Sequence, residues 1–232
     1  MMRLQSVLSA TCMFAVLLSG CGNLPGHPKP EAEVLRPEDQ LSFSVLYKQN
    51  CAACHGEGGQ NGASIDLANA VYQALVDDQS LKKWISGGMP GTQMPAWAIS
   101  DGGPLTERQI DVLVRGMRGS WSRQNALGGE SPPPYLQGEK GDASRGQQDY
   151  NTYCLSCHQR STQQVSSPDY LALVSNQALR TIIIAGRPDI GHPDWRQEKP
   201  GTPLSSQDVT DIVTYLETLR SPTPGQPYPQ HP

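Results

Sequence analysis

Two short cysteine-containing segments constrain this 232-residue chain more than any other feature of its sequence. Residues 51–55 read CAACH and residues 154–158 read CLSCH, so both have the pattern C-x-x-C-H. In this pattern two thiols add to the vinyl groups of a haem and the histidine becomes the proximal ligand of the iron. One helical turn brings both sulfurs to one porphyrin edge and places the imidazole under the iron. The sequence therefore predicts two covalently bound haem c groups, attached at Cys51, Cys54, Cys154 and Cys157 and ligated by His55 and His158.

Two other uses of paired cysteines fit the sequence less well. In a four-cysteine zinc site the two cysteine pairs usually lie about 15–20 residues apart. Here the two pairs lie about a hundred residues apart, and each is followed by histidine. A redox-active disulfide expects a thioredoxin-like βαβ pattern around the cysteines, which is absent here. One C-x-x-C-H can arise by chance, but two copies with matching downstream sequence favour haem attachment.

The N-terminus has the pattern of an export signal. Arg3 supplies a positive charge, residues 7–18 are mainly apolar, and small residues follow. The apolar run is too short for a spanning helix, which predicts a signal peptide over residues 1–20 rather than an uncleaved anchor. Leu18-Ser-Gly-Cys21 resembles the lipobox of bacterial lipoproteins. We therefore expect acylation of Cys21, a tether over residues 21–37, and a protein anchored by lipid to a membrane on the periplasmic side of the bacterial envelope.

Composition narrows the class of protein further. The formal net charge of −4 gives no support for nucleic-acid binding. Aromatic residues make up only 6 %, and 23 Gly and 20 Pro are present, so the apolar content is low for two conventional cores. Either much of the chain is linker, or a group other than side chains fills the interiors.

The two C-x-x-C-H segments belong to an internal repeat that runs through most of the chain. Both copies have a short helical pattern before the first cysteine, a second helix that ends at glycine, an x-Pro-x-Trp segment, and a last amphipathic helix that begins with Thr or Ser. The aligned pairs are 43–51 with 146–154, 81–88 with 179–186, 94–97 with 192–195, and 105–117 with 204–216.

On these motifs each half resembles a class I cytochrome c domain, over residues 38–122 and 143–221. The resemblance implies an all-α fold in which short helices surround one haem, and the haem supplies the missing core. Residues 123–142 are rich in Pro and Gly and are expected to link the domains. Residues 222–232 form a Pro-rich tail.

The resemblance also predicts a close crossing of the first and last helices, where a glycine of the first meets an aromatic residue of the last. The second half keeps this arrangement with Gly146 and Tyr215. In the first half the aligned residues are Phe43 and Gly116, so the large and small partners have changed places. Because the summed volume is similar, we expect Phe43 to contact Gly116.

In the first half the resemblance places the distal ligand of the iron in the loop before the last helix. Met94 lies 39 residues after His55 and precedes Pro95. Met89 also precedes a proline and is the competing candidate. The M-P-x-W pattern and the distance to Leu105 favour Met94.

The second half contains no methionine. His192 occupies the position aligned with Met94, 34 residues after His158, and it is followed by the same Pro and Trp spacing. We therefore expect His192 as the distal ligand of the second haem, with an open five-coordinate iron as the alternative. His27 and His231 lie in the tether and the tail and are poor candidates.

Three further residues are expected near the haems. In the resembled family a proline carbonyl often accepts a hydrogen bond from the proximal histidine, and Pro168 fits that position in the second half. In the first half the aligned residue is about Ser64, which leaves this contact open. Trp97 and Trp195 are expected to flank their haems or simply to pack.

These ligands imply a redox function. Thioether ligation raises the reduction potential of haem iron, whereas a second imidazole stabilises the oxidised form. We expect electrons to pass from the second haem to the first, in a dihaem carrier or electron-transfer subunit that works between redox proteins such as a membrane oxidoreductase and an oxidase. The alternative is a dihaem enzyme of peroxidase or thiosulfate-dehydrogenase type, with His192 displaceable from the iron.

Overall fold

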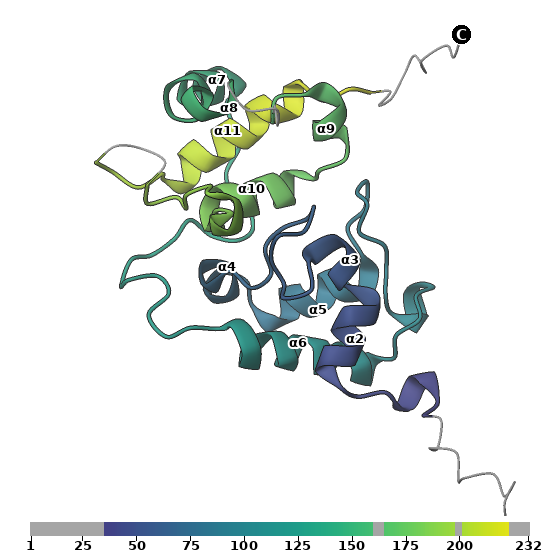
Figure 1. Ribbon diagram of the computed structural model, residues 1–232. Coiled ribbons are helices and arrows are strands. Elements are labelled where there is room, and N and C mark those ends of the chain that lie inside the picture. The colour runs from purple at the N-terminus through teal and green to yellow at the C-terminus, as the bar shows by residue number, and fades with distance from the viewer. Residues whose placement is uncertain (1–34, 160–164, 198–200, 223–232) are drawn as a thin grey trace, which may run out of the picture. The chain divides into compact units, whose positions relative to one another are not determined.

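The computed structural model describes residues 35–159, 165–197 and 201–222 (Figure 1). The expected signal peptide, Cys21 and nearly all of the tail lie outside these residues. The chain forms two compact units, which divide after Asp39. In the first unit the described residues form the 3₁₀ turn η2 Pro37–Asp39, next to which Arg36 Nε donates a hydrogen bond to the Asp39 carboxylate at 2.9 Å.

The second unit begins with the helices of the first half of the repeat (Figure 1). Asn69, Asp77 and Thr106 accept backbone N–H groups at the starts of three of these helices, and Thr106 forms a reciprocal capping box with Gln109. The predicted threonine cap of the last helix is thus confirmed. The elements are α2 Phe43–Asn50, α3 Ala52–His55, α4 Ala70–Leu75, α5 Asp78–Gly87, the 3₁₀ turn η3 Ile99–Asp101, and α6 Glu107–Trp121.

The second half repeats this order of elements. Its last helix begins at a capping box formed by Ser205 and Asp208. A π-helical turn leads into its cysteine segment where the first half has a regular helix end, and such turns are frequent at functional sites. The elements are α7 Ala143–Asp149, η4 Tyr150–Cys154, α8 Leu155–His158, α9 Pro168–Ala172, α10 Asn176–Ala185, the 3₁₀ turn η5 Pro188–Ile190, and α11 Ser206–Thr218.

The all-α fold is confirmed: the described residues form helices and turns and contain no strand, only isolated bridges such as Arg187 with His192. The mid-chain helices end at glycine as predicted, with α5 followed by Gly88 and α10 by Gly186. In the part of the chain that the structure describes, no helix has the length and hydropathy needed to span a bilayer.

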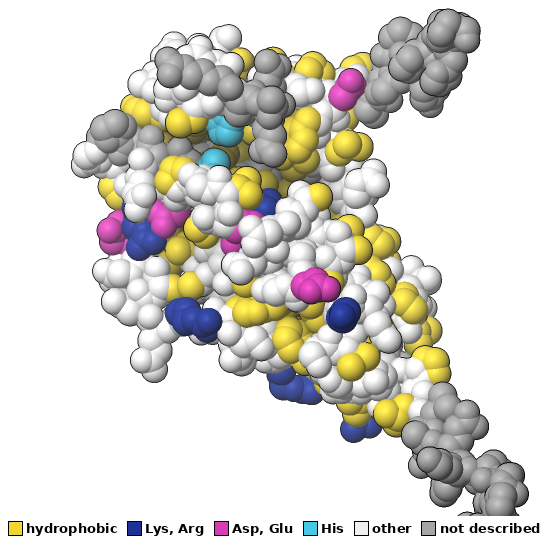
Figure 2. All heavy atoms as spheres, in the orientation of Figure 1, with side chains coloured by type: hydrophobic (Ala, Val, Ile, Leu, Met, Phe, Trp, Pro, Cys, Tyr) yellow, Lys and Arg dark blue, Asp and Glu magenta, His cyan; other side chains and the backbone are white. Residues whose placement is uncertain are grey.

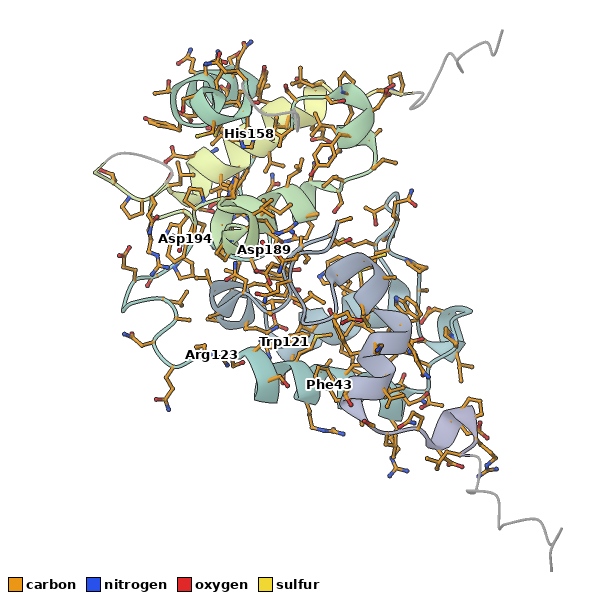
Figure 3. The ribbon with its side chains drawn as sticks, viewed as in Figure 1. Phe43, Trp121, Arg123, His158, Asp189 and Asp194 are labelled. Carbon is orange, nitrogen blue, oxygen red and sulfur yellow. The ribbon has the colours of Figure 1, made fainter. Side chains whose placement is uncertain are left out.

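The first and last helices of the first half pack through the exchanged pair. A Cβ placed on Gly116 would overlap the ring of Phe43, which confirms the predicted contact between these residues. The Phe43 ring also lies 5.7 Å from the ring of Trp121, the last residue of α6. Figure 3 labels both residues. The large side chain of this crossing, Phe43, therefore comes from α2, and the space that accommodates it, over Gly116, lies on α6.

In the second half the glycine of the helix crossing lies against helix backbone. A Cβ on Gly146 would meet first the backbone of Asp211 and Ile212 rather than the side chain of Tyr215. The ring of Tyr215 instead packs against Tyr150, with centroids 5.6 Å apart. The helices α7 and α11 approach so closely that backbone, and not an aromatic ring, occupies the space over the glycine.

Candidate haem sites

One cavity of the first half brings together the residues that the sequence singles out. Cys51 caps the end of α2, and the single turn of α3 carries Cys54 and His55 to the cavity wall. Met94 reaches the same cavity from the loop after α5. Both cysteines line this cavity as free thiols, so their sulfurs are available for thioether bonds to a haem there.

A backbone carbonyl fixes the orientation of His55. Its Nδ1 lies 3.0 Å from the carbonyl oxygen of Ile65, which can only accept, so Nδ1 carries the proton and Nε2 keeps its lone pair. Burial lowers the pKa of His55, which favours the neutral imidazole that an iron needs. The acceptor lies ten residues after the histidine, one position beyond Ser64, where the repeat alignment had left this contact open.

Two methionines line the cavity, but their sulfurs have different surroundings. The Sδ atom of Met89 accepts a hydrogen bond from the Ser175 hydroxyl at 3.5 Å. The backbone N–H of Met89 also donates to the carbonyl oxygen of Met94 at 3.0 Å, which ties the two ends of this loop together. Met89 is thus engaged with a residue of the second half, and this favours Met94 as the ligand.

The loops that carry Met94 and His192 have the same backbone geometry. A Cβ on Gly88 would meet the backbone of residues 94–96, and one on Gly186 would meet the backbone of residues 193–194, so only glycine lets each loop fold back over the helix end. The tryptophan that follows each loop donates its N–H to the preceding helix, to Ile85 in one half and to Ile184 in the other. The aligned positions therefore occupy equivalent places.

The second half brings the rings of His158 and His192 close together. Their ring centroids lie 5.9 Å apart with an interplanar angle of 41°. Two imidazoles bound to opposite sides of one metal, with metal–nitrogen bonds of about 2 Å, have centroids about 6 Å apart. Cys154 caps the start of α8, and α8 carries Cys157 and His158, so the donor set fits a covalently attached haem with two imidazole ligands.

His192 is held from several sides. Its backbone pairs with Arg187 through two hydrogen bonds of 3.0 Å, and its Nδ1 lies 2.8 Å from the carbonyl oxygen of Pro193. That carbonyl can only accept, so Nδ1 carries the proton and Nε2 keeps its lone pair. Burial lowers the pKa of His192, which again favours the neutral ring. Figure 2 shows histidine side chains at the surface of the face drawn, among hydrophobic side chains.

The remaining predicted neighbours have mixed outcomes. Trp97 lines the first cavity. Trp195 is 1 % exposed, and the Arg196 guanidinium lies 4.7 Å from its ring centroid. The carbonyl oxygen of Pro168 accepts the backbone N–H of Ser221 at 3.1 Å, and its predicted contact with His158 stays a prediction.

Sequence reasoning missed several residues of the first cavity. Trp84 of α5, Tyr135 of the predicted linker, and Arg187 from the loop after α10 all line it. Tyr135 is only 7 % exposed, so this part of the linker is packed rather than a free tether. No repeat or motif marks these positions, because they reach the cavity through contacts between distant parts of the chain.

Comparisons with known proteins identify the family of both halves. The family model described as "Cytochrome C oxidase, cbb3-type, subunit III" matches residues 39–115 and again residues 141–216. The "Cbb3-type cytochrome c oxidase subunit CcoP" of Azospirillum sp. (strain B510) is 26 % identical over 146 residues, which cover 54 % of this chain and 43 % of that protein. The similarity thus spans less than half the length of this relative.

A solved structure gives a weaker similarity. A chain of the Kuenenia stuttgartiensis reducing HAO-like protein complex has a TM-score of 0.43 and 20 % identity, over 84 % of this chain and 100 % of that one. A similarity of this size supports no conclusion about function.

The two family matches together cover well over half of the sequence. The chain therefore belongs to the cytochrome c oxidase cbb3-type subunit III family, as a dihaem electron-transfer cytochrome with two tandem cytochrome c domains and two covalently bound haem c groups.

Proposed function

We propose that this protein is a lipid-anchored electron carrier, or an electron-transfer subunit, on the periplasmic side of the bacterial envelope. The observation that carries the proposal is the pairing of His158 with His192 at a centroid distance of 5.9 Å, in contrast to the His55 and Met94 pair of the first half. If these four side chains hold the two irons, no position would be left for a substrate. The proposed role is therefore electron transfer without substrate chemistry.

Haem iron supplies one-electron chemistry between its ferrous and ferric states. In the first half His55 and Met94 would hold the iron. The Ile65 carbonyl holds His55 in the tautomer that exposes Nε2. Met94 supplies a thioether, which favours the ferrous state and raises the reduction potential.

In the second half His158 and His192 would hold the iron. A second imidazole donates more strongly than a thioether and favours the ferric state, so this site is assigned the lower potential. With this ligand difference, electrons would pass from the second site to the first. The Pro193 carbonyl and the backbone of Arg187 hold His192 in place, which supports permanent rather than displaceable ligation.

The proposed partners and cellular location are supported by the N-terminal sequence and by the similarity to an oxidase subunit. The lipobox-like segment at Leu18–Cys21 supports acylation of Cys21 and attachment to a membrane without a spanning helix. The Azospirillum relative is named as a subunit of an oxidase, which supports a redox protein as the partner of this chain. We therefore propose a membrane oxidoreductase or soluble carrier as donor and an oxidase as acceptor.

A reductive titration followed by the absorbance and magnetic circular dichroism of each haem tests the proposed order. The first haem is expected to accept an electron before the second. Reduction of the second haem at the higher potential would contradict the proposed direction of transfer.

Exposure of the reduced protein to carbon monoxide separates a carrier from an enzyme. No rapid binding is expected, because Met94 and His192 occupy the distal positions. Rapid binding to one haem would instead support a dihaem enzyme with a displaceable ligand. A His192→Gly variant, which opens the second site, is the positive control for binding.

A further inference from the structure

Asp66 is a buried carboxylate of the first half that the proposed ligation of the irons does not use. Its residue is 5 % exposed, and it stands between Ile65 and Leu67, which both line the first cavity. The carbonyl oxygen of Ile65 is the acceptor that lies 3.0 Å from Nδ1 of His55. The carboxyl group therefore belongs to the residue directly after the one that orients a proposed iron ligand.

One oxygen of this carboxyl group is left without a donor. The Oδ1 atom of Asp66 is buried and has no hydrogen-bond partner among the described residues. An ionised carboxylate can only accept, and a buried charge that is not fully paired and hydrogen-bonded is costly. The neutral, protonated carboxyl group loses much less free energy on burial, so this position favours binding of a proton.

The nearest positive charge is already engaged by another carboxylate. The Arg187 residue is 7 % exposed, and its Nε and Nη2 donate to the two oxygens of Asp189 at 2.9 Å and 2.8 Å. Nη2 also donates to the carbonyl oxygen of Gly62 at 3.0 Å. Within the described residues, Asp66 receives none of these bonds. One guanidinium thus faces two buried carboxylates and pairs with only one of them.

The third titratable neighbour of Asp66 is Tyr47 on α2. Its hydroxyl donates to the carbonyl oxygen of Gly56 at 2.9 Å, and burial raises its pKa well above the ordinary value, so it stays neutral. The hydrogen bonds from Arg187 hold the pKa of Asp189 below its ordinary value, so that carboxylate stays charged. Asp66 is therefore the member of this group whose charge can change.

The surroundings of Asp66 place this change of charge in a mild pH range. Burial raises the pKa of Asp66, and the Asp189 carboxylate adds to the rise. The backbone of Ala68 and Asn69 and the Arg187 guanidinium offset part of it, so the ionised form stays accessible. An electron added in the neighbouring cavity is a further negative charge, and a like charge nearby favours the protonated form.

We propose that Asp66 is a proton-binding site linked to electron transfer at the first haem. When one electron enters the iron from the redox donor, the carboxylate takes up one proton from water, and an O–H bond forms on the carboxyl group. When the electron leaves to the acceptor, that bond breaks and the proton returns to water, so the summed charge of iron and carboxyl group is unchanged. The inference rests on the proposed electron transfer at the site of His55 and Met94.

The reduction potential of the first haem, measured from about pH 4 to about pH 8, tests the link, because the ordinary pKa of an aspartate is about 3.9. The potential is expected to fall as the pH rises through the raised pKa of Asp66. The expected total is about a tenfold change in the reduction equilibrium, or about 59 mV for one electron. Asp66→Asn keeps the shape and is always neutral, so it is expected to remove this step and to keep the potential near its acid value.

Asp101→Asn is the matched control, because Asp101 is an exposed carboxylate of the same half, on η3. It is expected to keep the step. Infrared difference spectra between the reduced and oxidised protein give a second readout. A band of a protonated carboxyl group is expected in the reduced protein and in Asp101→Asn, and its loss is expected in Asp66→Asn.

A step and a band that both persist in Asp66→Asn would assign the proton to another group and overturn the inference. A potential that does not vary with pH in the unaltered protein would also overturn it. If Asp66→Asn does not mature, Asp66→Glu keeps a titrating group and is expected to shift the pH of the step and the frequency of the band, and no shift in either would contradict the proposal. Absence of a redox-active haem at Cys51 and Cys54 would instead refute the proposed function.

Discussion

Arg187 and Asp189 form a buried ion pair at 2.8 Å, with side chains that are 8 % and 1 % exposed. The pair joins the two halves, because Asp189 accepts the backbone N–H of Asn61 at 2.8 Å and Arg187 donates to the carbonyl oxygen of Gly62 at 3.0 Å. The backbone of Arg187 also pairs with His192. One ion pair thus supports the contact between the halves and the loop of a proposed iron ligand.

Asp189→Ala is expected to destabilise the protein by about 3 kcal/mol, because it leaves a buried guanidinium without its counter-charge. Urea unfolding followed by far-UV circular dichroism measures the effect. Asp101→Ala is the control, since Asp101 is exposed on η3, and it is expected to change stability by less than about 0.5 kcal/mol. Equal losses in the free energy of unfolding for the two substitutions would show that the buried ion pair does not stabilise the protein more than an exposed carboxylate does.

The same pair makes stability depend on acid pH. The Arg187 guanidinium, opposed by burial, holds the pKa of Asp189 below its ordinary value. The carboxylate therefore contributes its full stability above pH of about 4 and loses it as the pH falls through the depressed pKa. The stability gap between the unaltered protein and Asp189→Asn is expected to be constant from pH 7 to pH 5 and to shrink below pH 4. A gap that grows on acidification would contradict this assignment.

The packing of Phe43 on Gly116 predicts a cost for a single methyl group. Gly116→Ala would overlap the Phe43 ring, which Tyr47 and Trp121 hold in place, and is expected to cost about 1–3 kcal/mol. Gly119→Ala lies on the same helix with open space around the new methyl group, and is expected to stabilise the protein by about 0.5–1 kcal/mol. Urea unfolding of both variants tests how closely the helices cross. Gly116→Ala is expected to have the lower unfolding midpoint, and a midpoint equal to or above that of Gly119→Ala would contradict the close crossing.

Substitution of the two methionines tests which sulfur ligates the first iron. Met94→Leu is expected to remove the thioether-to-iron charge-transfer band and to lower the potential of the first haem, because the thioether that favours the ferrous state is lost. Met89→Leu breaks only the contact with Ser175 and is expected to keep the band. Loss of the band in Met89→Leu, with retention in Met94→Leu, would reverse the assignment.

Local features of both haem sites could be predicted from the sequence. The C-x-x-C-H segments, the caps at Thr106 and Ser205, and the glycines after α5 and α10 depend on residues close together in the chain. The repeat added the long-range information that aligned His192 with Met94. The exchanged pair Phe43 and Gly116 followed from the same alignment, because the summed volume at a helix crossing is conserved.

Contacts between the halves could not be predicted in this way. Tyr135 reads as linker because it follows three prolines, and its burial depends on bonds from Gln177 and Arg180 of α10. The close approach of the Asp211 and Ile212 backbone to Gly146 was not predicted, because the distance between two helix backbones cannot be read from residue type alone. These features depend on packing that neither periodicity nor motif spacing records.

Low-temperature electron paramagnetic resonance of the fully oxidised protein tests the central claim most directly, because the spectrum distinguishes the axial ligands of each low-spin ferric haem. We predict two signals of equal intensity, one typical of imidazole with thioether ligation and one typical of two imidazoles. His192→Met is expected to convert the second signal to the first type. A high-spin signal from a five-coordinate iron, or two signals of the same type in the unaltered protein, would contradict the unequal ligation of the two haems.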